Sequence, residues 1–91
     1  MNVWIMTSWA DGCEGDHVVG VYKDFETAAE VALKEIKRME HDMFVHSEAL
    51  TEIRTEFKDG YASYTLVCTY PGEGNVPLIS DILELNRYEV S

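Results

Sequence analysis

Residues 51–68, TEIRTEFKDGYASYTLVC, decide the fold of this chain. The dipeptide Asp59-Gly60 is typical of a type I′ turn, and a segment of alternating character lies on each side of it. With a two-residue loop, Phe57 lies opposite Ala62 and Ile53 lies opposite Leu66, so one face of the hairpin is apolar. The remaining pairs on that face are Thr55 with Tyr64 and Thr51 with Cys68, and those on the other face are Glu56 with Ser63, Arg54 with Thr65 and Glu52 with Val67. The segment predicts an antiparallel hairpin with one buried face.

A helix is predicted from Phe25 to about His41. Apolar residues recur there at spacings of three and four, which is the pattern of an amphipathic helix. Asp24 stands directly before the first of them, in the position of an N-cap. The apolar stripe consists of Phe25, Ala28, Ala29, Ala32, Leu33, Ile36 and Met39, and the opposite side carries Glu26, Glu30, Lys34, Lys37 and Arg38. The exposed side of this helix is therefore nearly balanced in charge.

Three further strands are predicted, over Val3–Trp9, His17–Lys23 and Ile82–Val90. The element order is then strand, strand, helix, hairpin, strand. This order favours an α+β fold in which a mainly antiparallel sheet of four or five strands has the helix (about 25–41) packed on one face. At 91 residues, the chain has room for a single domain spanning 1–91.

One helix can cover only one face of a sheet, so the other face is expected to be solvated or covered by a partner. The first strand is apolar at four consecutive positions, Val3-Trp4-Ile5-Met6, which indicates that both of its sides are covered. We expect Trp4, Met6 and Val67 to form the interface of a homodimer on the face opposite the helix.

The chain is strongly acidic. It contains 17 Asp and Glu against 7 Lys and Arg, a formal net charge of -10. Such a surface repels nucleic acid and anionic lipid and favours a basic partner. We therefore expect a basic protein of the nuclease type as the partner, and neither nucleic acid nor a membrane.

The acidic residues concentrate between positions 40 and 59, on and near the predicted hairpin. Alternate residues of a strand repeat at about 6.6 Å, a spacing comparable to that of successive phosphates. A row of carboxylates on one sheet face can therefore compete for a groove that binds DNA or RNA, although Arg54 and Lys58 interrupt this row. The predicted partner-binding residues are Glu48, Glu52, Glu56 and Asp59.

Three small groups have side chains that could carry chemistry. His41, Asp42 and His46 could bind a metal, and Cys13 with His17 could pair a thiolate with a base; Asp11, Glu14 and Asp16 could offer oxygen ligands to calcium. None of these groups has the spacing of a known metal, nucleophile or phosphate site. We expect a helix end and solvated loops here, with no catalytic residue, metal or cofactor.

Cys13 and Cys68 are the only cysteines, and the N-terminal residues lack the basic and apolar regions of a signal peptide. Two free thiols and a cytoplasmic location are expected. No stretch is long and apolar enough to predict a transmembrane helix.

The stretches VWIMTSW (3–9) and VVGVYKDFETAAEVALKEI (18–36) resemble the opening of small uncharacterised phage and bacterial proteins. In those proteins a strand, a polar loop and a second strand ending in a Gly-Val-aromatic step lead into a Glu- and Ala-rich helix. The resemblance covers about residues 3–36, and the hairpin at 50–70 is an addition to its shorter members. It implies a small accessory protein, and the analogy to acidic phage inhibitors of host nucleases is one of size and charge.

The sequence thus favours a non-enzymatic, phage-encoded binding protein that occludes a basic, nucleic-acid-binding surface of a host protein such as a nuclease. Two alternatives stay open. The loop at 10–17 could serve a small-ligand or nucleotide-binding protein or a small enzyme. The chain could also be a structural homodimer whose acidity only confers solubility.

Overall fold

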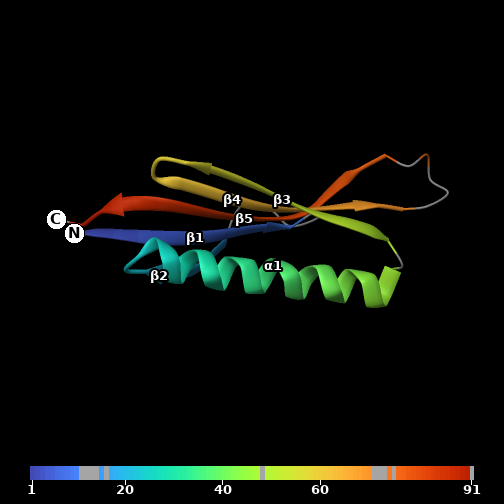
Figure 1. Ribbon diagram of the computed structural model, residues 1–91, viewed down its shortest axis with the longest axis horizontal. Coiled ribbons are helices and arrows are strands. Elements are labelled where there is room, and N and C mark those ends of the chain that lie inside the picture. The colour runs from blue at the N-terminus through green and yellow to red at the C-terminus, as the bar shows by residue number, and fades with distance from the viewer. Residues whose placement is uncertain (11–14, 16, 48, 71–73, 75, 91) are drawn as a thin grey trace.

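The computed structural model describes residues 1–10, 15, 17–47, 49–70, 74 and 76–90. They form a five-stranded antiparallel sheet with strand order β2-β1-β5-β4-β3 and one helix, α1, along one face (Figure 1). The elements are β1 (Asn2–Ala10), β2 (His17–Tyr22), α1 (Phe25–Ser47), β3 (Leu50–Lys58), β4 (Tyr61–Thr69) and β5 (Leu78–Glu89). The predicted α+β class, with one helix on one face of the sheet, is confirmed.

The hairpin of β3 and β4 has the register that the sequence predicts. Phe57 pairs with Ala62, Ile53 with Leu66 and Thr51 with Cys68, without a register shift along the pair. Gly60 has a φ of 73°, the left-handed conformation that a type I′ turn requires and that glycine adopts without strain. The turn residues therefore determine which side chains of β3 and β4 face α1.

The predicted faces of β1 are wrong at two positions. Met6 is 2% exposed and belongs to the core beneath α1, and Trp4 packs against the same core. The residues of β1 that face away from α1 are Val3, Ile5, Thr7 and Trp9, because successive side chains of a strand point to opposite faces. Four consecutive apolar residues contain no alternation, so the sequence could not distinguish the two orientations.

α1 begins where the sequence predicts and ends six residues later. The Asp24 carboxylate accepts a hydrogen bond of 2.8 Å from the Thr27 amide, and this bond holds the pKa of Asp24 below its usual value. The stripe facing the sheet continues through Met39 to Met43, whose sulfur accepts a hydrogen bond from the Tyr70 hydroxyl. This extra turn packs on the far end of the sheet, so the helix continues to Ser47.

The core lies between α1 and the three central strands of the sheet, β1, β5 and β4. The largest fully buried side chains are Ile36 from α1, Leu66 and Cys68 from β4, and Leu83 and Leu85 from β5. The helix contributes mainly small residues at its contact positions, Ala28 and Ala32, which let it approach the sheet closely. Cys68 is a free thiol on the buried hairpin face, as predicted, and Cys13 lies outside the described residues.

Burial raises the pKa of the Cys68 thiol above its ordinary value of 9.0. Because the folded state then holds the proton more tightly than the unfolded state, this group's contribution to stability is complete below pH 9.0 and is lost as the pH rises further. We expect urea unfolding to show a larger loss of free energy from about pH 8 to about pH 10 in the native protein than in Cys68→Ala. Equal losses in the two proteins would mean that this thiol titrates normally.

Among the described residues, α1 is too polar to be a membrane-spanning helix.

Candidate functional site

The sheet face opposite α1, called the open face below, is covered by no described element (Figure 1). Ile5 pairs with Val21, Val3 with Tyr88 and Trp9 with Ile82, and side chains of directly opposed residues lie on the same face. The apolar residues of this face include Val3, Ile5, Trp9, Val18, Val21, Val67, Ile82 and Tyr88.

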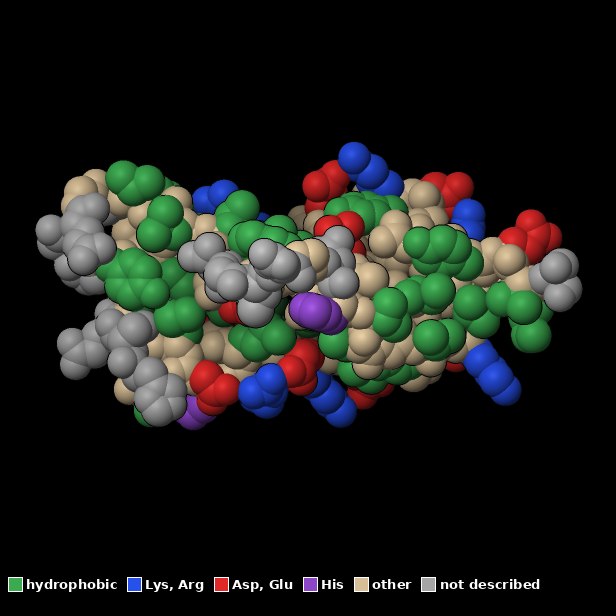
Figure 2. Space-filling model, turned by 180° about the vertical axis from the view of Figure 1, so that it is seen from behind, with side chains coloured by type: hydrophobic (Ala, Val, Ile, Leu, Met, Phe, Trp, Pro, Cys, Tyr) green, Lys and Arg blue, Asp and Glu red, His purple; other side chains and the backbone are tan. Residues whose placement is uncertain are grey.

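Several of these apolar side chains are in contact with solvent. Val21 is 60% exposed and Tyr88 52% exposed. Figure 2 shows hydrophobic side chains on both halves of the molecule, with one group on the half that holds the two termini. A contiguous exposed apolar surface of this kind marks an interaction site more often than scattered single residues do. The strand pairing therefore assembles an exposed apolar surface from three segments of the chain.

The open face also carries charge, and most of it is internally paired. Glu52 forms an ion pair with Arg54 at 3.2 Å, and Glu56 forms an ion pair with Lys58 at 2.9 Å. These four exposed residues alternate in sign along β3, so their row has no net charge. Two of the predicted partner-binding residues thus share one face, as expected, but the cations between them remove the run of negative charge that mimicry of a phosphate backbone needs.

The remaining glutamate of the open face is Glu84, which lies opposite Thr7 and Ser63 near the centre of the sheet. Within the described part of the chain it makes no ion pair, and it is partly buried. A partly buried carboxylate, with the uncharged Thr7 and Ser63 as its cross-strand neighbours, favours a cationic group on a partner.

The other predicted site residues lie elsewhere. Asp59 is in the turn between β3 and β4, 3.4 Å from the Arg87 guanidinium, and Glu48 lies outside the described residues. Of the predicted dimer residues, only Val67 is on the open face, where it pairs with Glu52 and Ile79, and it is 3% exposed. Trp4 and Met6 face α1, so the predicted interface does not form as a single surface.

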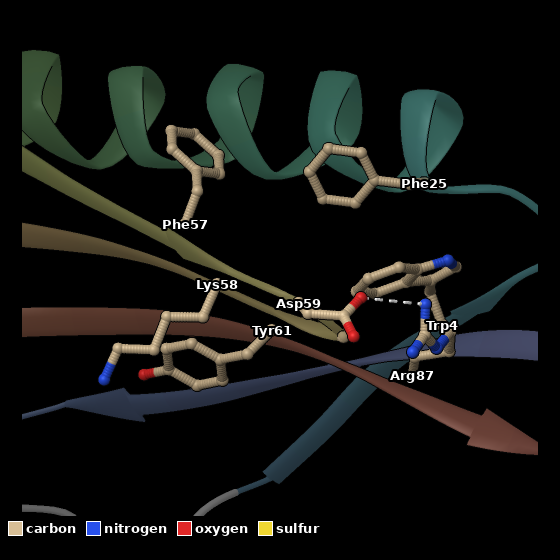
Figure 3. A pocket seen from close by; sticks show the side chains of 8 residues that line it. Trp4, Phe25, Phe57, Lys58, Asp59, Tyr61 and Arg87 are labelled. Carbon is tan, nitrogen blue, oxygen red and sulfur yellow. Dashed lines mark ion pairs between the residues drawn. The ribbon is translucent and has the colours of Figure 1, made fainter.

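A second feature is an aromatic pocket at the start of α1 (Figure 3). The Trp4 and Phe25 ring centres are 4.9 Å apart, and those of Phe25 and Phe57 are 6.4 Å apart with nearly perpendicular planes. Phe25 and Phe57 lie in the layer between helix and sheet, and Arg87 lies beside Trp4 with its ion pair to Asp59. The pocket has a volume of about 380 Å³ and is lined by these five residues with Lys58, Gly60 and Tyr61.

The chemistry of this pocket suits an apolar group. Its walls are aromatic, and its two cations are already paired, Arg87 with Asp59 and Lys58 with Glu56. Phe57 is 59% exposed, so the pocket is open to solvent at the edge of β3. It can accept a ring or a branched aliphatic side chain, which offset and edge-to-face contacts would hold.

The smaller groups noted in the sequence do not form a site in the described residues. His41 and Asp42 are exposed on α1, where Asp42 pairs with Arg38 at 3.0 Å, and no three described His, Cys, Asp or Glu side chains are close enough to share a metal. His17 is exposed at the start of β2. The proposed partners in these groups, Cys13, Asp11, Glu14, Asp16 and the His46 side chain, lie outside what the structure describes.

Comparison with protein-family models, with curated proteins and with solved structures gives no match.

Sequence reasoning expected an uncovered sheet face opposite the helix but assigned Trp4 and Met6 to it, and it missed the aromatic pocket. The open face depends on β5 lying between β1 and β4, an order that one sequence does not contain. The aromatic pocket joins residues 4, 25 and 57, which lie in three separate elements. The only signal that could have located the open face was the apolar character of both sides of residues 3–6.

Proposed function

We propose that this protein is a non-enzymatic binding protein whose open face docks on a basic surface of another protein. The observation that carries the proposal is an exposed apolar sheet face with Glu84 near its centre, in a chain of net charge -10. Among the residues that the structure describes, Glu84 pairs with no cation. Apolar contacts supply affinity in the middle of such an interface, and the charge of the whole chain speeds the encounter with a cationic partner.

A partner of this kind is a nucleic-acid-binding protein, whose binding surface is basic by necessity. A host nuclease in a phage infection is the case that the resemblance of residues 3–36 suggests. Occlusion of that surface would inhibit the partner without any chemistry by this chain. The paired row on β3 contributes less to this proposal than the sequence led us to expect, because its carboxylates are already neutralised.

The proposal predicts that Val21→Glu weakens partner binding at least tenfold, because it puts a charge into the apolar part of the open face. The matched control is Val45→Glu on α1, since Val45 is exposed to nearly the same degree, 58% against 60%, on the other side of the molecule. The native protein is used to capture a partner from a bacterial lysate, and the partner is purified. Biolayer interferometry then measures the partner's affinity for the native protein and for each of the two variants. Equal affinities for the two variants would remove the open face from the interface.

The charge part of the proposal is tested with the same purified partner. We expect Glu84→Gln to slow association and to reduce its dependence on salt, whereas Glu89→Gln has a smaller effect because Glu89 lies at the end of β5, on the α1 side. A DNA duplex should compete with this protein for the partner. Binding that is insensitive to both salt and DNA would rule out a basic nucleic-acid-binding surface as the target.

A further inference from the structure

The two edges of the sheet differ in how well they are protected from pairing with another strand. β2 is short, at six residues, contains Gly20 and pairs with β1 through a register shift between Met6 and Thr7. β3 has nine residues, neither glycine nor proline, and pairs with β4 without a shift. Bulges, short length, proline and charged side chains are the features that normally prevent an edge strand from adding a further strand. Of these features β3 has only the charged side chains, so a further strand has to match their charges. Of the two edges, β3 is the one that can accept another strand.

The hairpin geometry determines which backbone groups of β3 point outward. Lys58 and Tyr61 flank a two-residue turn, so they form a hydrogen-bonded pair, and such pairs alternate along an antiparallel ladder. The even-numbered residues of β3 thus bond to β4. The odd-numbered residues, from Thr51 to Phe57, direct their N–H and C=O groups away from the sheet. Outside the helix and strand ladders, the backbone hydrogen bonds between described residues do not involve β3.

We propose that β3 pairs antiparallel with β3 of a second copy of this chain, about a two-fold axis at Thr55. Only residues with outward backbone groups can form the hydrogen-bonded pairs, so Thr55 then pairs with Thr55 of the other copy and Ile53 with Phe57. In the same register Arg54 lies opposite Glu56, and Glu52 lies opposite Lys58. Each charged residue of the strand therefore meets the opposite charge.

The charge order selects this register over its neighbours. Moving the axis by one residue, to Arg54, would place Glu52 opposite Glu56. Moving it the other way, to Glu56, would place Arg54 opposite Lys58. Like charges directly opposite each other destabilise a strand pair, and unlike charges stabilise it. The same four residues that neutralise one another within the monomer form a self-complementary row when one strand is turned through 180°.

The apolar side of β3 also favours the second copy. Phe57 is 59% exposed although its ring packs against Phe25 and Tyr64. In the proposed register, Ile53 of the other copy is its cross-strand neighbour on the α1 side. The dimer is then a ten-stranded sheet with both helices on one side, and the two open faces form one continuous surface on the other.

The proposal is tested by sedimentation equilibrium of the full chain at micromolar concentration and physiological salt. We expect the native protein to have twice the monomer mass of 10.4 kDa. Arg54→Glu and Glu56→Arg should each weaken the dimer at least tenfold, because each substitution sets like charges opposite each other. An equimolar mixture of the two variants should form a one-to-one dimer, since their charges complement each other, and the double variant R54E/E56R should dimerise with itself.

A backbone variant provides an independent test. Thr55→Pro removes an outward N–H without removing a bond to β4, so it should give a folded monomer, as judged by circular dichroism. A native protein that is monomeric throughout, or a mixture of the two charge variants that stays monomeric, would overturn the proposal. A dimer that survives Thr55→Pro but is lost in Val21→Glu would overturn it too, and would place the contact on the open face.

Discussion

Met6→Glu is expected to leave most of the chain unfolded at room temperature. Met6 is 2% exposed beneath α1, so the substitution would bury a carboxyl group among apolar side chains. Burial of an unpaired charge or its forced protonation costs several kcal/mol, which is comparable with the total stability of about 5–15 kcal/mol of a typical domain. Circular dichroism and urea unfolding measure the effect.

The matched control for Met6→Glu is Ile5→Glu at the adjacent position. Ile5 lies on the open face and is only partly buried, so the new carboxylate can reach water. We expect this variant to unfold cooperatively, with a loss of about 1–3 kcal/mol. A larger loss for Ile5→Glu than for Met6→Glu would show that β1 has the opposite orientation, with Met6 on the open face.

Ile36→Ala is expected to lower the free energy of unfolding by about 2–5 kcal/mol. The Ile36 side chain is fully buried between α1 and the sheet, and Ala32, one turn earlier on the same helix face, is too small to fill a cavity there. Thermal and urea unfolding give the value. Leu33→Ala is the control on the same helix, because Leu33 is 39% exposed, and we expect it to cost less than about 1 kcal/mol. Similar losses in both variants would contradict the packing of α1.

The hairpin could be predicted residue by residue because two independent signals agree in it. The turn dipeptide Asp59-Gly60 sets the register, and the alternation of apolar and polar residues in β3 and β4 requires the same register. The first half of α1 has the same kind of redundancy, with a cap at Asp24 and a regular apolar stripe. Where two local signals agree, the sequence alone is enough to predict the element and its register.

The rest depended on long-range contacts. β5 begins at Leu78, four residues before its predicted start, and a register shift between Leu66 and Val67 lets its first residues pair with β4. A bulge of this kind adds one residue to a strand and increases its local twist, and no turn or glycine signal at Leu66 and Val67 predicts it from the sequence. The position of β5 between β1 and β4 had no local signal either, so the composition of the open face could not be derived.

The candidate site was predicted in part. Glu52 and Glu56 do share an exposed face, but a reading of charges along the chain underestimates how far Arg54 and Lys58 neutralise them. The side chains project from one strand at about 6.6 Å intervals, within reach of long flexible cations. The row along β3 was expected to be negative, but it consists of neighbouring opposite charges with no net charge.

The register shift between Met6 and Thr7 also bears on how this chain resists fibril growth. A strand edge can recruit further copies without limit only when each addition presents a new flat edge. β2 is interrupted where that shift falls, and Tyr22 lies over Gly20 on the side of α1, so the ladder presented at this end is short and irregular. We therefore expect the β2 edge to end any assembly that forms through β3, so that the chain does not polymerise.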